Sequence, residues 1–286
     1  MHRRQRRRGG EPVAALEQRV LLAAFVVTSA ADNTTADSLT TLREAIILAN
    51  GSAGADTITF GDGTGLGGTN FTDGVADTIT LSLGQMQISE TVTITGLSAA
   101  KTIISGNNAS RIFSISSGDT TLEKLTLTGG KTTETSFAGD GGAIHSTSTG
   151  TLTVSQSTLS GNSTTGDSAR GGAIYAGFGA VTVSQSTLSG NSTTGYGAHG
   201  GAIFSLSGSV TVSQSTLSGN STTGDGADGG AIRSNSSGTL TVSQSTLSGN
   251  STAGGGAAGG AISAHYGVIT VSQSTLSGNS TAGSSA

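Results

Sequence analysis

The chain has 286 residues, with 47 Gly, one Pro and no Cys, and only 10% of its residues are charged. Ordinary globular domains have about 25% charged residues, and here Ser, Thr, Gly, Asn and Ala take the place of the missing charges. This composition excludes a disulfide framework and a broad globular core. We therefore expect an architecture in which a few aliphatic side chains per unit stack over a long distance.

The net charge of −4 is unevenly distributed, because residues 1–22 carry +4 and the rest of the chain carries −8. A basic start, an apolar stretch at 20–27 and small residues at 29–31 are typical of an export signal. Residues 1–24 are therefore predicted to form a basic leader or export segment.

Two features leave the cleavage site of this leader open. Residues 17–19 interrupt the apolar stretch, and residues 25–28 also fit a first β-strand. No aromatic residues interleave with the arginines, so no nucleic-acid partner is expected. No stretch reaches the roughly 18 apolar residues of a membrane-spanning helix, so no transmembrane helix is expected either.

Residues 25–140 are predicted to form an N-terminal cap. A helix is expected over 39–50, where Thr41 and Glu44 have the spacing of a capping box. Its apolar face is formed by Leu42, Ala45, Ile46 and Ala49. A short amphipathic helix ahead of a solenoid suits an end cap, because it covers hydrophobic side chains and open strand edges.

Irregular strands are expected after this helix, and they suggest about three degenerate turns before the regular ones. They lie at 57–60, 78–81, 91–94, 102–104, 111–115 and 122–127.

Residues 141–286 contain five repeats of 29–30 residues. Gly-Gly-Ala-Ile begins at 141, 171, 200, 229 and 259, and an invariant block of ten residues, Val-Ser-Gln-Ser-Thr-Leu-Ser-Gly-Asn-Ser, begins at 154, 183, 212, 242 and 271. A fixed period of this length is the signature of a solenoid.

Each repeat contains three short strand-like segments, which in the second repeat are 172–176, 180–184 and 186–189. Alternating aliphatic residues point to one face of each segment. We therefore predict an all-β fold, a right-handed parallel β-helix with three strands per turn and a short N-terminal capping helix.

Stacking of identical turns places each residue over its copies, about 4.8 Å apart. One inward ladder is expected from Ile144, Ile174, Ile203, Ile232 and Ile262. Stacked amides that hydrogen-bond along the axis are expected from Asn162, Asn191, Asn220, Asn250 and Asn279. Each Asn also begins an Asn-Ser-Thr sequon, but the repetition indicates turn structure more than glycosylation.

Several motifs resemble known families. Leu42-Arg43-Glu44-Ala45-Ile46, followed by Gly54-Ala55-Asp56-Thr57-Ile58-Thr59-Phe60, resembles the CSLREA domain, although Thr40-Thr41 replace its Cys-Ser. The Gly-Gly-Ala-Ile and Ser-Gly-Asn units are similar to polymorphic outer-membrane-protein repeats of bacterial surface proteins. Residues 16–22 resemble the LEPR-x-LL leader of planctomycete proteins, with Gln18 in place of Pro. The resemblance implies a pectate-lyase-like β-helix on an exported protein and implies no reaction.

Candidate functional residues are few. Asp62, Asp73 and Asp77 lie in Gly-rich sequence and are a weak candidate for binding a cation such as calcium, although turn aspartates explain them more simply. The histidines have no zinc-binding spacing, and no cofactor is expected.

One position changes from repeat to repeat directly after the ladder Ile. It holds His145, Tyr175, Phe204 and Arg233. These side chains are expected to project side by side from successive turns, as a candidate surface-binding strip for sugars or a partner protein. Neutral surface variation among the copies explains them more simply.

The sequence therefore favours a non-enzymatic secreted or cell-surface protein, extracellular or at the outer membrane, that acts as a stalk or an adhesin-like binding platform. Expected partners are glycans or surface proteins, and the uncapped C-terminal edge predicts end-to-end self-association. A polysaccharide lyase or hydrolase is the alternative, with activity in the N-terminal turns. An ice-binding solenoid is a remote alternative, suggested by outward Thr residues.

Overall fold

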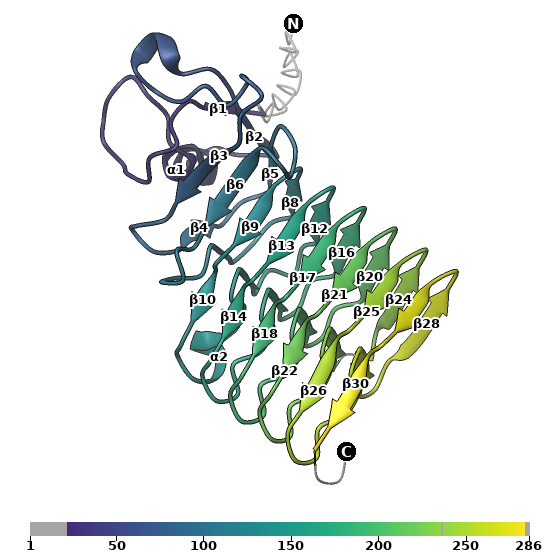
Figure 1. Cartoon of the computed structure of the whole chain (residues 1–286). Coiled ribbons are helices and arrows are strands. Elements are labelled where there is room, and N and C mark those ends of the chain that lie inside the picture. The colour runs from purple at the N-terminus through teal and green to yellow at the C-terminus, as the bar shows by residue number, and fades with distance from the viewer. Residues whose placement is uncertain (1–21, 236, 284–286) are drawn as a thin grey trace, which may run out of the picture.

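A computed structural model describes residues 22–235 and 237–283. Most of the predicted leader lies outside the described residues. The described chain winds into a parallel β-solenoid whose strands form four columns along one axis (Figure 1). All strand pairs in these columns are parallel, and each strand pairs with its counterpart one turn later.

The two largest of the four sheets contain nine and eight strands. The nine-stranded sheet contains β1 (Ala24–Val27), β2 (Asp56–Phe60), β5 (Val92–Thr95), β8 (Thr120–Glu123), β12 (Leu152–Ser155), β16 (Val181–Ser184), β20 (Val210–Ser213), β24 (Thr239–Ser243) and β28 (Val268–Ser272). The eight-stranded sheet contains β3 (Asp77–Thr80), β6 (Thr102–Ser105), β9 (Thr126–Thr128), β13 (Thr158–Ser160), β17 (Thr187–Ser189), β21 (Thr216–Ser218), β25 (Thr246–Ser248) and β29 (Thr275–Ser277).

The other two sheets complete each turn. The seven-stranded sheet contains β4 (Met86–Ile88), β7 (Phe113–Ile115), β11 (Ile144–Ser146), β15 (Ile174–Ala176), β19 (Ile203–Ser205), β23 (Ile232–Ser234) and β27 (Ile262–Ala264). The six-stranded sheet contains β10 (Lys131–Thr132), β14 (Ser163–Thr164), β18 (Ser192–Thr193), β22 (Ser221–Thr222), β26 (Ser251–Ala253) and β30 (Ser280–Ala282).

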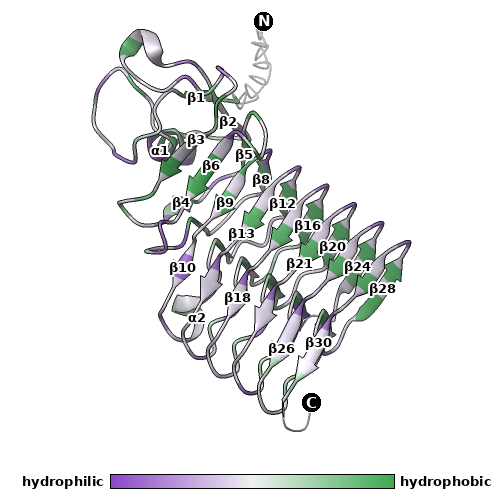
Figure 2. Cartoon of the chain, viewed as in Figure 1, coloured by the Kyte–Doolittle hydropathy of each residue, from purple (hydrophilic) through white to green (hydrophobic). Residues whose placement is uncertain are grey.

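The prediction of three strands per turn is wrong for the regular repeats, which have four. The strand that the sequence did not reveal is the short Ser-Thr segment after the Asn corner, such as β14 and β18. It carries no aliphatic residue, and its buried side is a Thr whose hydroxyl donates to a backbone carbonyl, as in Thr164 to Ala169 at 3.0 Å. Figure 2 shows most of this sheet as pale, whereas strands of the nine-stranded sheet are largely green.

The core is a set of aliphatic ladders. Ile144, Ile174, Ile203 and Ile232 are fully buried and in register, whereas Ile262 in β27 is only half-buried. In parallel sheets, strands with one buried face show alternating side chains, and β16 has this pattern, with Val181 and Val183 inside.

Helix α1 (Leu42–Gly51) is present where the sequence predicted a helix, and Thr41 and Glu44 form the predicted capping box. Its buried residues are Leu42, Ala45, Ile46 and Ala49, and it packs against β1, β2 and β4. Arg43 on the same helix forms an ion pair with Asp32 at 2.6 Å. Two further helical segments are short: a 3₁₀ helix, η1 (Thr64–Leu66), and α2 (Ser136–Gly139). Within the described residues, no helix is long and apolar enough to cross a membrane.

The last described turn is the least buried part of the solenoid. Leu276 is 47% exposed, whereas Leu217 at the equivalent position two turns earlier is 0% exposed. Both residues stand in the same invariant block, and among the described residues only Leu217 has a further turn stacked on it.

This contrast gives a test of stacking. Replacement of Leu217 by Ala should lower the free energy of unfolding by about 2–5 kcal/mol, since a buried Leu is lost and a cavity remains. Replacement of Leu276 by Ala should cost less than about 1 kcal/mol. Thermal or denaturant unfolding of the two variants provides the comparison, and equal losses would contradict the stacked arrangement.

Candidate functional site

The predicted strip residues lie side by side on the seven-stranded sheet. His145 pairs in register with Tyr175, Tyr175 with Phe204, and Phe204 with Arg233. The rings of His145 and Tyr175 stack with centroids 5.1 Å apart, and those of Tyr175 and Phe204 stack at 5.6 Å. Stacking contributes about 0.5–1.5 kcal/mol per aromatic pair beyond burial.

These side chains are not on the open surface that the sequence analysis expected. Tyr175 is 2% exposed, Phe204 is 1% exposed and Arg233 is 8% exposed. The cause is the link that precedes each strand, which turns at a left-handed glycine such as Gly171, with a φ of 69°, and folds back over the strip. The links therefore cover the strip at Tyr175, Phe204 and Arg233, which is not an accessible binding surface.

The covering residue stands five positions before the strip residue in each repeat. These residues form a second row that contains Asp140, Arg170, His199 and Asp228. The guanidinium of Arg170 lies 5.0 Å from the ring centroid of Phe204, and the ring of His199 stacks on the same side chain at 6.2 Å. Asp228 forms an ion pair with Arg233 at 3.0 Å. We call the two rows together the link cluster.

The second row is also tied to the backbone of the next turn. The backbone N–H of Arg170 donates to Oδ1 of Asp140 at 2.7 Å. The N–H of Asp228 donates to Nδ1 of His199 at 2.9 Å. The N–H of Ala258 donates to Oδ1 of Asp228 at 2.8 Å. Side chains of the link cluster thus serve as acceptors between links.

Burial shifts the titration of this cluster. Burial lowers the pKa of His145 to about 4, and the charge of Arg111 acts in the same direction. Burial also lowers the pKa of His199 to about 4, with Arg233 adding to the effect and Asp228 opposing it. The neutral imidazole of His199 is the form that accepts from Asp228 N–H.

Asp140 is the most unusual member, because it is 0% exposed and its Oδ2 has no hydrogen-bond partner among the described residues. Burial raises its pKa to about 7, although the backbone N–H of Arg170 and the charges of Arg170 and Arg111 oppose this shift. Burial of the ring and the charge of Asp140 raise the pKa of Tyr175 to about 12. The cluster is a packed, partly neutral contact between link and strand.

The sequence analysis missed the second row, although a signal was present. The residue directly before Gly-Gly-Ala-Ile is charged or His in four of the five repeats, at 140, 170, 199 and 228. Because this chain has so few charged residues, a charge that recurs at one position indicates a contact with the other variable position of the repeat.

The predicted Asn residues form a continuous amide ladder. The Nδ2 of Asn191 donates to Oδ1 of Asn220 at 2.9 Å and to the carbonyl of Leu159 at 2.9 Å. The backbone N–H of Asn191 donates to the same Oδ1 at 3.0 Å. The four residues Asn162, Asn191, Asn220 and Asn250 are 0% exposed, which places their amides inside the solenoid.

The aspartates proposed for a cation lie in turns before and at β3. Oδ1 of Asp62 accepts from the backbone N–H of Thr64 at 2.9 Å, and Oδ1 of Asp73 accepts from that of Val75 at 2.7 Å. Asp77 begins β3, and burial together with the charge of Asp73 raises its pKa. Across the part of the chain that the structure describes, no three His, Cys, Asp or Glu side chains gather as a metal site.

The buried carboxyl of Asp140 predicts a pH effect on stability. Its pKa is about 7 in the folded protein and near 3.8 in the unfolded chain, so its contribution to stability is complete below pH 3.8 and is lost as the pH rises through 7. The variant Asp140→Asn should therefore melt near the wild-type temperature at low pH and above it in alkaline solution. Melting curves across this range test it, and a gain confined to acid would contradict the assignment.

His199 has the opposite sign and provides the control. Its folded pKa lies below the ordinary 6.5, so its contribution is present above pH 6.5 and is lost as the pH falls toward 4. His199→Asn, which keeps an acceptor for Asp228 N–H, should reduce the loss of melting temperature in acid. In alkaline solution it should melt slightly below the wild type, because the stacking on Phe204 is lost.

The amide ladder gives a further prediction. Asn220→Ala should lower the free energy of unfolding by about 2–4 kcal/mol, because several buried groups lose their partners. Asn279→Ala should cost less, since Asn279 is only half-buried and water can replace its amide. Denaturant unfolding measures both, and an equal cost would show that the ladder does not depend on burial.

Scans against protein-family models, curated proteins and solved structures found no match.

Proposed function

We propose that the protein is a non-enzymatic secreted or cell-surface protein whose solenoid is a rigid stalk or adhesive platform. The observation that carries this proposal is the outward surface of the repeated turns. In-register hydroxyl rows run along the nine-stranded sheet at Thr153, Thr182, Thr211, Thr241 and Thr270, and along the eight-stranded sheet at Thr158, Thr187, Thr216, Thr246 and Thr275. Each unit adds length and continues both hydroxyl rows.

The link cluster supports a structural role, because its charged groups face one another and the neighbouring strand. The basic leader and the resemblance to CSLREA and outer-membrane-protein repeats support export to the cell surface. Within this proposal the coil is right-handed and pectate-lyase-like, and helix α1 acts as its cap by covering the first turns. Glycans or surface proteins are the proposed partners.

The proposal predicts that length can be changed without loss of fold or surface attachment. Excision of residues 184–212 joins Val183 to Ser213 and preserves the invariant block. The shortened chain should fold and should be shorter by about 4.8 Å in solution scattering. On producing cells, an antibody should detect both the full and the shortened chain without permeabilisation. Detection only after permeabilisation would contradict the surface role.

An activity assay separates the polysaccharide-enzyme alternative. The full chain should leave alginate and polygalacturonate at full length. Depolymerisation that disappears in Asp73→Asn or Asp77→Asn would overturn the proposal in favour of an enzyme. Both side chains precede or begin β3, so neither substitution disturbs the regular repeats.

A further inference from the structure

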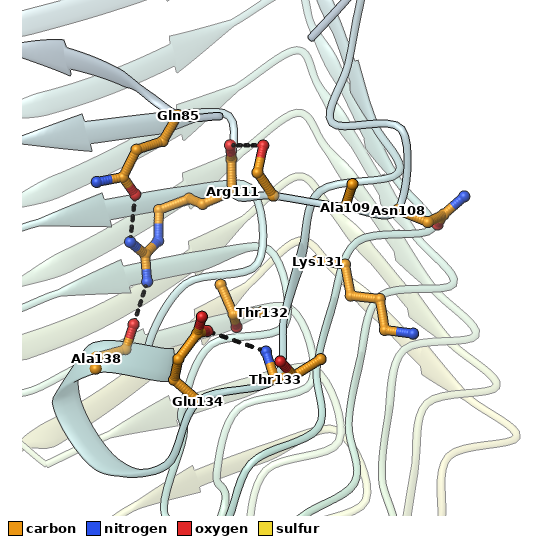
Figure 3. A pocket seen from close by; sticks show the side chains of 10 residues that line it. Gln85, Asn108, Ala109, Arg111, Lys131, Thr132, Thr133, Glu134 and Ala138 are labelled. Carbon is orange, nitrogen blue, oxygen red and sulfur yellow. Dashed lines mark hydrogen bonds between the residues drawn. The ribbon is translucent and has the colours of Figure 1, made fainter. Parts of the chain in front are cut away.

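A polar pocket lies where the irregular turns meet the regular ones. It has a volume of about 380 Å³ and lies between the corner at 108–111 and strand β10 with its following link. Figure 3 shows Arg111 and Gln85 on one side of it, Glu134 below and Lys131 at the opposite rim. Small-molecule sites commonly have volumes of about 300 Å³ or more, so the volume of this pocket suits one compact ligand.

The pocket exists because the cross-section of the solenoid widens at this point. Ile104 pairs with Leu127, 23 residues later, whereas Leu127 pairs with Leu159, 32 residues later. The longer turn is the first to contain a strand of the six-stranded sheet, namely β10. No earlier strand of that sheet lies beneath β10 among the described residues, so its edge forms a ledge above the narrower turns.

Glu134 occupies a position at this ledge where the later turns have no room for a side chain. Its counterpart one turn later is Gly166, where an added Cβ would lie 1.9 Å from the carbonyl oxygen of Glu134. Only a position without a turn beneath it has room for a side chain. Oε2 of Glu134 accepts from the backbone N–H of Thr133 at 3.1 Å, whereas the matching N–H of Thr165 donates to the carbonyl of Thr132 at 3.0 Å.

Arg111 supplies a cation at the base of the pocket and is 8% exposed. Its Nε and Nη2 donate to the backbone carbonyls of Ala138, Asp140 and Gly141, and its Nη1 donates to Oε1 of Gln85 at 2.5 Å. A guanidinium has five N–H groups, so one on Nη1 is left over. Over the described residues, neither Arg111 nor Lys131 forms an ion pair within 4.0 Å.

We propose that this pocket binds a single acidic sugar unit. The remaining N–H of Arg111 would hold the carboxylate, since charge-assisted bonds from Arg to a carboxylate are among the strong hydrogen bonds of proteins. Lys131 adds attraction at the rim. The hydroxyls of Ser110 and Thr133 provide partners for sugar hydroxyls, whereas the carboxylate of Glu134 repels the carboxylate of the ligand. This site goes beyond the stalk function, because a stalk requires no ligand, and either can fail without the other.

Binding to the full chain should be measured by calorimetry or NMR titration with three probes. D-glucuronate should bind. D-glucose, which lacks the carboxylate, should bind at least tenfold more weakly, the loss expected when about one charged hydrogen bond disappears. Glutarate keeps a carboxylate but lacks the ring hydroxyls, and the loss of several neutral hydrogen bonds should also weaken its binding at least tenfold. Equal binding of glucose, equal binding of glutarate, or no binding of glucuronate would each overturn the proposal.

Charge variants test the position of the site without disturbing Arg111, which holds the backbone of the link. Lys131→Met should weaken glucuronate binding roughly threefold, and Glu134→Gln, which keeps an acceptor for Thr133 N–H, should strengthen it by a similar factor. Lys124→Met removes an equal charge outside the pocket and should change nothing. Unchanged affinity in both pocket variants, or a loss in Glu134→Gln, would place the ligand elsewhere.

Discussion

Hydrogen bonding between each turn and the next, in strict register, is the interaction on which the rest of the structure depends. It sets the spacing of turns, and it also decides which side chains are tolerated, because every residue is stacked on its own copy. Amide and hydroxyl groups suit this arrangement, since each both donates and accepts. The buried serines show it directly: Ser157 N–H donates to Oγ of Ser186, and Ser186 N–H donates to Oγ of Ser215, both at 3.1 Å.

Charged residues suit the same arrangement poorly, because identical stacked charges repel one another over a short distance. The link cluster avoids this by varying the residue from turn to turn. Along its second row, Asp140 is followed by Arg170, then by a neutral His199, then by Asp228. The low content of charged residues and the exceptional variability of this position are two results of one constraint.

The sequence predicted most of the fold because the period is unmistakable and aliphatic alternation locates the strands. It did not reveal β14 and its copies, since two polar residues carry no hydrophobic pattern. Lys124, with a φ of 57°, also divides the segment predicted as one strand at 122–127 into β8 and β9. The covering of Tyr175 depends on how the link folds, and the pocket depends on unequal turn lengths, so neither is encoded in a single repeat.

The contrast between Glu134 and Gly166 also bears on how such a chain can lengthen in evolution. Unequal recombination between near-identical units can duplicate a turn anywhere downstream, because every new copy brings glycine at the position that needs it. Upstream of Glu134 a duplicated wide turn would press its backbone against that side chain. The gene can therefore gain repeats only downstream of this residue. The first wide turn stays the first member of the array however many turns are added.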